Sequence, residues 1–170
     1  MPSQSTIEGI VNFASDLKGI DLKILREGFE IARLHRQVEQ VIENDLAGWG
    51  LNARQVEIME ALYYNTKGTM TPADLSEEVS LTRSAMTSAL DSLEKVGHIV
   101  RRPHPTDRRM LAISLTPPGR AFIEKHLPER YQRLHRIFAG CLSKEERSCL
   151  LHSYAKVLEF LAADMAKGRK

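Results

Sequence analysis

The sequence lacks the features that place a protein in a membrane or in an oxidising compartment. Its 170 residues contain no run of about 18 apolar residues, so no segment is expected to span a bilayer as a helix. The N-terminal stretch has no basic region followed by a long apolar core, which is the pattern of a secretory signal. Two cysteines, Cys141 and Cys149, are too few for a disulfide framework. We therefore expect a cytoplasmic protein with no membrane association.

Motifs for catalysis and for metal binding are also missing. The sequence has no glycine-rich phosphate loop, no nucleophile elbow and no set of metal ligands at the usual spacing. Cys149 and His152 lie one helical turn apart and could share a metal ion, but no third or fourth ligand is evident, and core packing is the favoured interpretation. Cys141 and Cys149 are both expected to be small apolar packing residues of a core. We therefore expect neither an enzyme nor a cofactor.

The net charge of +2 excludes a protein that binds nucleic acid as a bulk polycation. The charge is nevertheless unevenly distributed along the chain. Residues 1–80 hold seven Lys or Arg and thirteen Asp or Glu, whereas residues 81–170 hold seventeen and nine. Any affinity for a polyanion must therefore come from the local placement of basic residues in the second half of the chain.

Residues 81–96 have the pattern of an amphipathic helix, with Thr82 as a natural N-cap and Gly97 as its terminator. The apolar residues recur at spacings of three and four, and the expected buried stripe is Leu81, Ala85, Met86, Ala89, Leu90, Leu93 and Val96. The opposite face carries Arg83, Ser84, Thr87, Ser88 and Asp91. Because most of these side chains are short, the helix could approach a groove closely while hydroxyls and one arginine reach base edges.

After Gly97 the apolar period changes from about 3.6 residues to about 2, which indicates strands. Residues 98–102 and 110–116 alternate in polarity, and their core-facing positions are expected to be Ile99, Leu111, Ile113 and Leu115. Pro103 and Pro105 are expected to interrupt the strands, so the segment predicts a two-stranded hairpin, or wing. The arginines of this wing are Arg101, Arg102, Arg108 and Arg109.

A helix with a small polar face beside an arginine-rich hairpin suits the recognition of duplex DNA. The helix fits the major groove, and the wing arginines reach the phosphates and the narrow minor groove. Arg101, Arg102 and Arg108 are expected on phosphates, and Arg109 in an A/T-rich minor groove. The alternative is a hairpin whose arginines are simply solvated, since runs of charge usually form exposed faces.

The segment from Thr71 to Gly119 resembles the winged helix-turn-helix of the MarR family of bacterial transcription regulators. Asp107, Arg109, Leu115 and Thr116 match that family's wing pattern of D-x-R followed by L-T. Similar organisation extends over nearly the whole chain. The resemblance implies a homodimer in which Arg109 enters the minor groove, steadied by Asp107 two residues before it.

Capping boxes predict where several helices begin, because a polar side chain three residues into the helix reaches back to the capping residue. The predicted boxes are Ser5–Glu8, Asn52–Gln55 and Ser143–Glu146. Asp21 is expected to cap a long helix that ends before Gly48, and Pro72 to lie in the first turn of a helix after Thr71. Pro128 is expected to kink or split the helix that follows Thr116.

The expected fold is mainly α, of the α+β type, in three parts. Residues 1–50 are predicted to be N-terminal dimerisation helices, residues 51–116 the winged helix-turn-helix lobe, and residues 117–170 the C-terminal dimerisation helices. A winged domain of about a hundred residues closes its own core, so the first and last helices keep apolar surface. We assign that surface to a homodimer interface.

A ligand site is expected in the cleft between the dimerisation helices and the DNA-binding lobe. His35 interrupts an apolar stripe and is interpreted either as a core histidine or as a residue of this cleft. With Arg36, Met59 and Tyr63 it offers a cation, an imidazole that can change its charge, and apolar walls. A small-molecule effector such as an aromatic carboxylate or another amphipathic anion fits this mixture.

These features favour a homodimeric repressor that binds a pseudo-palindromic operator in double-stranded DNA and is released by a small molecule. Repression and ligand control follow from the resemblance. Two alternatives stay open: a winged-helix protein-interaction module, which would not bind duplex DNA in a salt-sensitive way, and a redox switch at Cys141 or Cys149. The relatives that use a reactive cysteine carry it on the first long helix, where this chain has none.

Overall fold

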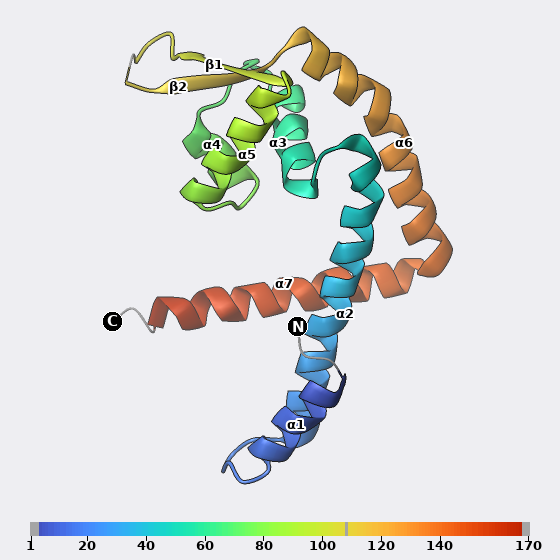
Figure 1. The fold of residues 1–170 in the computed structure, drawn as a ribbon. Coiled ribbons are helices and arrows are strands. Elements are labelled where there is room, and N and C mark those ends of the chain that lie inside the picture. Colours follow the sequence, from blue (N-terminus) through green and yellow to red (C-terminus); the bar gives the residue numbers. More distant parts are fainter. Residues whose placement is uncertain (1–3, 108, 168–170) are drawn as a thin grey trace. The chain divides into compact units, whose positions relative to one another are not determined.

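The computed structural model describes residues 4–107 and 109–167, which form helices and one two-stranded antiparallel sheet (Figure 1). The predicted mainly α fold with a two-stranded wing is confirmed. The chain divides into two compact units, Met1–Thr116 and Pro117–Lys170. Within the described residues, no helix has both the length and the apolar character needed to cross a bilayer.

The first unit begins with α1 (Gln4–Ala14) and α2 (Leu22–Leu46), which lie against each other. The Glu8 carboxylate of α1 accepts two hydrogen bonds from the Arg26 guanidinium of α2. Asp21 caps α2 as predicted, because its Oδ1 accepts the amide of Lys23 at 2.8 Å. The prediction that Ser5 caps α1 is wrong, since the helix already includes Gln4 and places Ser5 inside its first turn.

A short 3-10 turn, η1 (Ala47–Trp49), leads to the three helices α3 (Ala53–Tyr64), α4 (Pro72–Glu78) and α5 (Arg83–Lys95). Each of them begins at a polar N-cap, as the sequence predicts. The side chains of Asn52, Thr71 and Thr82 accept the backbone amides of Gln55, Asp74 and Ala85. The tight turn between α4 and α5 contains Ser80 at a φ of 52°, and the pair forms the helix-turn-helix.

The wing consists of β1 (Ile99–Pro103) and β2 (Leu111–Leu115), paired antiparallel with Arg101 opposite Ile113 and Pro103 opposite Leu111. Pro103 therefore ends β1 instead of lying between the strands, and this terminal pair tolerates a residue without an N–H. The prediction that Leu111 faces the core is also wrong: it is 45% exposed at the end of the hairpin next to the wing loop. Met70 adds an isolated bridge to Ile113.

The core of the first unit lies where α5 meets α3, α4 and β1. It is built by Val56, Ile58, Met59, Leu62, Leu75, Met86, Leu90, Leu93, Ile99 and Ile113, all of them buried. The buried stripe of α5 is narrower than predicted, because Ala85 in the first turn and the C-cap Val96 are exposed. Three buried residues one turn apart remain to hold the helix.

The second unit contains α6 (Pro117–Cys141) and α7 (Lys144–Lys167). Pro128 does not split α6, which runs unbroken past it and curves along its length (Figure 1). The predicted capping box opens α7: the Ser143 amide donates to Glu146 Oε2 at 2.7 Å, and the Glu146 amide donates to Ser143 Oγ at 3.1 Å.

We expect Asp74→Ala to weaken the first unit at neutral pH. Hydrogen bonds from the Thr71 amide and hydroxyl hold the pKa of the Asp74 carboxyl below its usual value of 3.8. The stabilisation is therefore present above that value and is lost as the pH falls through the lowered pKa. Loss of this half of the capping box should cost about 0.5–1 kcal/mol, the lower part of the range for a helix cap. In urea denaturation the two proteins should differ at pH 7 and converge in acid. The control Glu78→Ala, at the other end of α4, should match the wild type at pH 7.

Candidate nucleic-acid interface

The polar face of α5 is exposed, as the amphipathic pattern predicts. Arg83, Ser84, Thr87 and Ser88 all lie on this face. The Thr87 hydroxyl donates to the carbonyl of Arg83 at 2.9 Å, so its proton is already used by the helix. Its lone pairs and its methyl group remain available, which leaves Thr87 able to accept a hydrogen bond or to touch an apolar group.

Gln55 anchors α5 to α3 and was assigned only a capping role from the sequence. Its Oε1 accepts the Asn52 amide at 2.9 Å, while its Nε2 donates to Ser92 Oγ on α5, also at 2.9 Å. The side chain is buried and meets both partners with one amide group. A capping glutamine gives no sign of its second partner, because that partner lies 37 residues further along the chain.

The wing tip is organised around Asp107. Its Oδ1 accepts the backbone amide of Arg109 at 2.9 Å, and its carbonyl accepts the amide of Met110 at 3.0 Å. An aspartate that accepts a backbone amide two residues on is a common device of tight turns. Asp107 thus contacts the residue that the family resemblance paired with it, through the backbone. Arg102 and Arg109 are exposed, and Arg108 lies outside the described residues.

Arg101 differs from the other described wing arginines, because its guanidinium turns back to α5. Its Nη1 lies 2.6 Å from Asp91 Oδ1 and 3.3 Å from Glu94 Oε2. Only 23% of the side chain is exposed. Asp91 was expected on the exposed face of α5 and lies there, whereas no role was predicted for Glu94.

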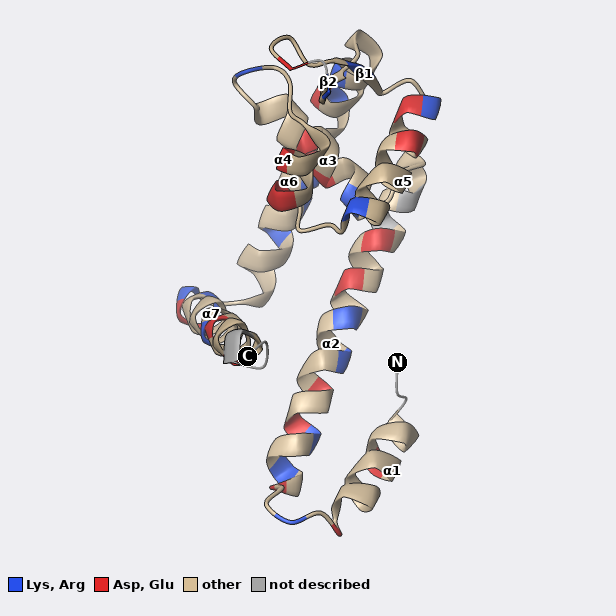
Figure 2. Ribbon diagram, turned by 90° about the vertical axis from the view of Figure 1, so that its left-hand side faces the viewer, with Lys and Arg blue, Asp and Glu red and all other residues tan. Residues whose placement is uncertain are grey.

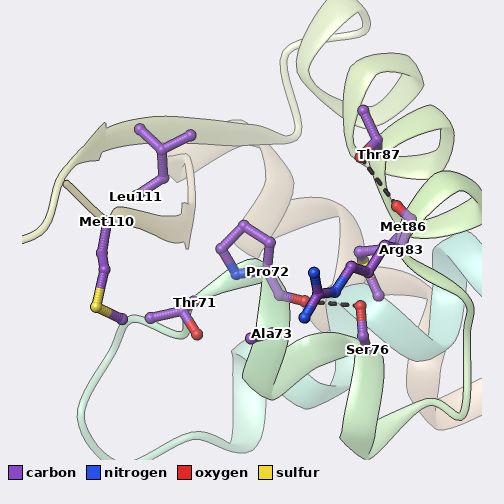
Figure 3. Close-up of a pocket in the computed structure, with 9 residues that line it drawn as sticks. All are labelled: Thr71, Pro72, Ala73, Ser76, Arg83, Met86, Thr87, Met110 and Leu111. Atoms are coloured by element: carbon purple, nitrogen blue, oxygen red, sulfur yellow. Dashed lines mark hydrogen bonds between the residues drawn. The ribbon is translucent and has the colours of Figure 1, made fainter.

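A pocket lies between α4, α5 and the start of β2 (Figure 3). Its lining residues are Thr71, Pro72, Ala73, Ser76, Arg83, Met86, Thr87, Met110 and Leu111. The Arg83 side chain extends from α5 toward Ser76 of α4 (Figure 3). The pocket therefore joins a cation to apolar walls directly beside the polar face of α5.

The four residues predicted to bind an effector are not among those that line this pocket. Met59 is fully buried, and Tyr63 is half-buried with its ring edge-on to Tyr64. His35 and Arg36 lie on the exposed surface of α2, which carries acidic and basic residues along its length (Figure 2). His35 is thus not a core histidine, as its side chain is 50% exposed and lies 3.5 Å from Glu39.

Both cysteines are exposed, so the expectation that they pack in a core is wrong. Cys141 ends α6 and Cys149 lies in α7, where most side chains face outward. Among residues 4–107 and 109–167, no three His, Cys, Asp or Glu side chains gather as a metal site would require.

Comparisons with known proteins agree with this architecture. Residues 49–110 match the model of the MarR family. The chain is 26% identical to the HTH-type transcriptional repressor YetL of Bacillus subtilis, over 90% of this chain and 91% of YetL. It is 31% identical to an uncharacterized HTH-type transcriptional regulator of Bacillus cereus, over 75% of this chain and 83% of that protein. A solved structure of an E. coli MarR variant complexed with operator DNA is similar at a TM-score of 0.69 and 26% identity, covering 80% and 96% of the two chains.

Proposed function

Because the chain belongs to the MarR family of transcriptional regulators and is not an enzyme, we propose that it binds a pseudo-palindromic operator in double-stranded DNA as a homodimer. We further propose that it represses transcription in the cytoplasm until a small molecule releases it. The observation that carries the proposal is the exposed polar face of α5 beside the arginine wing.

Direct reading of bases falls to the polar face of α5. Ser84, Thr87 and Ser88 are short enough to let the helix enter a major groove, and their oxygens and the threonine methyl can meet base edges. Since the Thr87 proton is held by the Arg83 carbonyl, Thr87 acts as an acceptor, suited to an exocyclic amino group of adenine or cytosine. Arg83 supplies a cation at the start of the helix.

Contacts to phosphates and to the shape of the minor groove fall to the wing. Arg102 is exposed and, with Arg108, is assigned to phosphates. Arg109 is assigned to the minor groove, where the negative potential of narrow A/T-rich segments attracts arginine. Asp107 holds the backbone amide of Arg109 at 2.9 Å, which supports a steadying role. The alternative of a protein-interaction module needs none of these cations.

The homodimer is supported by apolar surface that a single chain leaves uncovered. The apolar stripe of α7 stays exposed at Leu150, Leu151, Tyr154, Val157, Leu158, Leu161 and Met165. On α2, Ile24, Ile31 and Val38 are between 57% and 66% exposed. A two-fold dimer would cover such faces and set two recognition helices about 34–36 Å apart, one turn of duplex DNA.

An effector that is an aromatic or other amphipathic anion remains part of the proposal. Its charge would meet Arg36, and its ring would meet a wall that includes Tyr63, with His35 beside them. Arg36 and His35 are both exposed in the single chain, so a second copy would have to complete the cleft. Binding to a spread or rotated dimer would misplace the two recognition helices and release the operator.

The two kinds of DNA contact should separate in a salt series. We expect Arg102→Ala to weaken operator and scrambled duplex alike and to reduce the slope of log affinity against log salt by about 0.9 for each lost phosphate contact, doubled in a dimer. Ser88→Ala should change operator preference and leave the slope unchanged, because a hydroxyl displaces no counterion. Wild type without salt-sensitive duplex binding would contradict the proposed function and favour an interaction module.

Charging the α7 stripe should separate the subunits. We expect Leu158→Glu with Leu161→Glu to give monomers, because buried unpaired carboxylates disfavour the interface, and operator affinity should fall although no DNA contact is touched. Light scattering on a sizing column measures the first effect. The control Lys156→Glu, on the other side of the same helix, should stay dimeric, and a dimeric double variant would place the interface elsewhere.

Removing the cation of the effector site should affect release alone. We expect Arg36→Ala to bind operator like the wild type and to need about tenfold more benzoate, a simple aromatic carboxylate, for half release, because a charge-assisted contact is lost. Fluorescence anisotropy of labelled operator measures both. The control Arg33→Ala, whose guanidinium already pairs with Glu30 at 2.8 Å, should release normally. Equal release by all three proteins would remove Arg36 from the site.

A further inference from the structure

Arg101 joins the wing to the recognition helix α5 through three groups. Its guanidinium lies 2.6 Å from Asp91 and 3.3 Å from Glu94, and its Nη2 donates to the Thr87 carbonyl at 3.5 Å. Its backbone amide also donates to Glu94 Oε1 at 3.2 Å. Glu94 therefore holds both the main chain and the side chain of Arg101. We call Arg101, Asp91 and Glu94 the wing clamp.

The position of Arg101 in β1 explains why it turns inward. Successive side chains of a strand point to opposite faces, so Arg101 and Arg102 cannot share a direction. Arg102 is exposed, whereas the Arg101 side chain is only 23% exposed and lies against α5. Asp91 and Glu94 are three residues apart and therefore share a face of that helix. From this strand position, the Arg101 guanidinium reaches both carboxylates.

The clamp also removes an electrostatic problem. Asp91 and Glu94 lie on the helix proposed to enter a groove, where unpaired carboxylates would be repelled by phosphates. Arg101 neutralises part of that charge. The same contacts tie the middle of β1 to α5, so the wing and the recognition helix keep one relative orientation. That orientation decides whether a wing arginine reaches the groove adjoining the one that α5 occupies.

We propose that Arg101 is a positioning residue that fixes the wing on the recognition helix and does not contact a phosphate. This role replaces the phosphate contact expected from the sequence. It rests on the proposed DNA binding. Arg101 acts through Asp91 and Glu94, and its loss should leave the number of neutralised phosphates unchanged while the wing arginines lose their alignment.

The first test compares Arg101→Ala with the matched control Arg102→Ala in the full-length protein, on operator and scrambled duplex across a salt series. Arg101→Ala should lose about tenfold in operator affinity, a usual size for coupled neighbours, and keep the wild-type salt slope. Arg102→Ala should reduce the slope by about 0.9 per contact. A slope reduced equally in both variants would overturn the inference and leave the proposed function standing.

The second test changes the acidic partners of Arg101, because the two roles predict opposite changes in operator affinity. If Arg101 positions the wing, Asp91→Asn with Glu94→Gln should weaken operator binding although two negative charges are removed. If Arg101 can reach a phosphate, the same change frees it, and binding should tighten with a steeper salt slope. These mild changes also decide the matter if Arg101→Ala does not fold, and tighter binding would overturn the inference.

A charge swap supplies the rescue. Arg101→Glu alone should bind operator poorly, because three carboxylates then meet. Adding Glu94→Arg should restore most of the affinity and the preference for operator over scrambled duplex. An arginine that served a phosphate would not be replaced in this way, since Glu at position 101 would face the DNA. Absence of rescue in a folded double variant would overturn the inference, while a wild type that ignores duplex DNA would instead refute the function on which it rests.

Discussion

Burial of one side of α5 is the constraint on which the rest of the structure depends. Met86, Leu90 and Leu93 are each no more than 1% exposed and hold the helix where it meets α3, α4 and β1. A helix that is buried along one stripe must turn its other side outward, because its side chains are spread around the axis at 3.6 residues per turn. The short polar side chains thereby gain access to solvent. Hydrophobic packing therefore sets the direction of the face that we propose reads DNA.

Hydrogen bonds and ion pairs then fix the relative positions of elements that apolar packing alone leaves adjustable. Gln55 links α3 to Ser92 of α5, and Asp107 closes the wing tip on the amide of Arg109. Apolar contacts tolerate small rotations, whereas hydrogen bonds weaken steeply when their angle becomes unfavourable. If the helix and the wing read two adjacent grooves, as proposed, they must keep one relative orientation. We propose that the wing clamp of Arg101, Asp91 and Glu94 holds the wing and α5 in this orientation.

Outside the winged helix-turn-helix lobe, apolar side chains are exposed and not buried. The apolar stripe of α7 is exposed along its length, and α2 combines exposed Ile and Val side chains with many charges (Figure 2). Uncovered apolar area of this kind usually marks an interaction surface. In the proposed dimer, these helices set the distance between the two recognition helices. A ligand that alters how they meet would then control DNA binding without touching a DNA-contacting residue.

The sequence by itself determined the features that depend on local interactions. It determined the caps at Asn52, Thr71 and Ser143, the period of α5, the wing and the family, because each depends on neighbours within a few residues. Tertiary structure alone decided the rest, including the exposure of His35 and of both cysteines and the two strands' limits at Pro103 and Leu111. It also decided that Arg101 pairs with Asp91 and Glu94 of α5, since alternation along the strand places Arg101 on the same face as Ile99 but does not say which side chains it meets there. Exposure, strand ends and side-chain partners depend on contacts between residues far apart in the sequence, which short sequence patterns do not reveal.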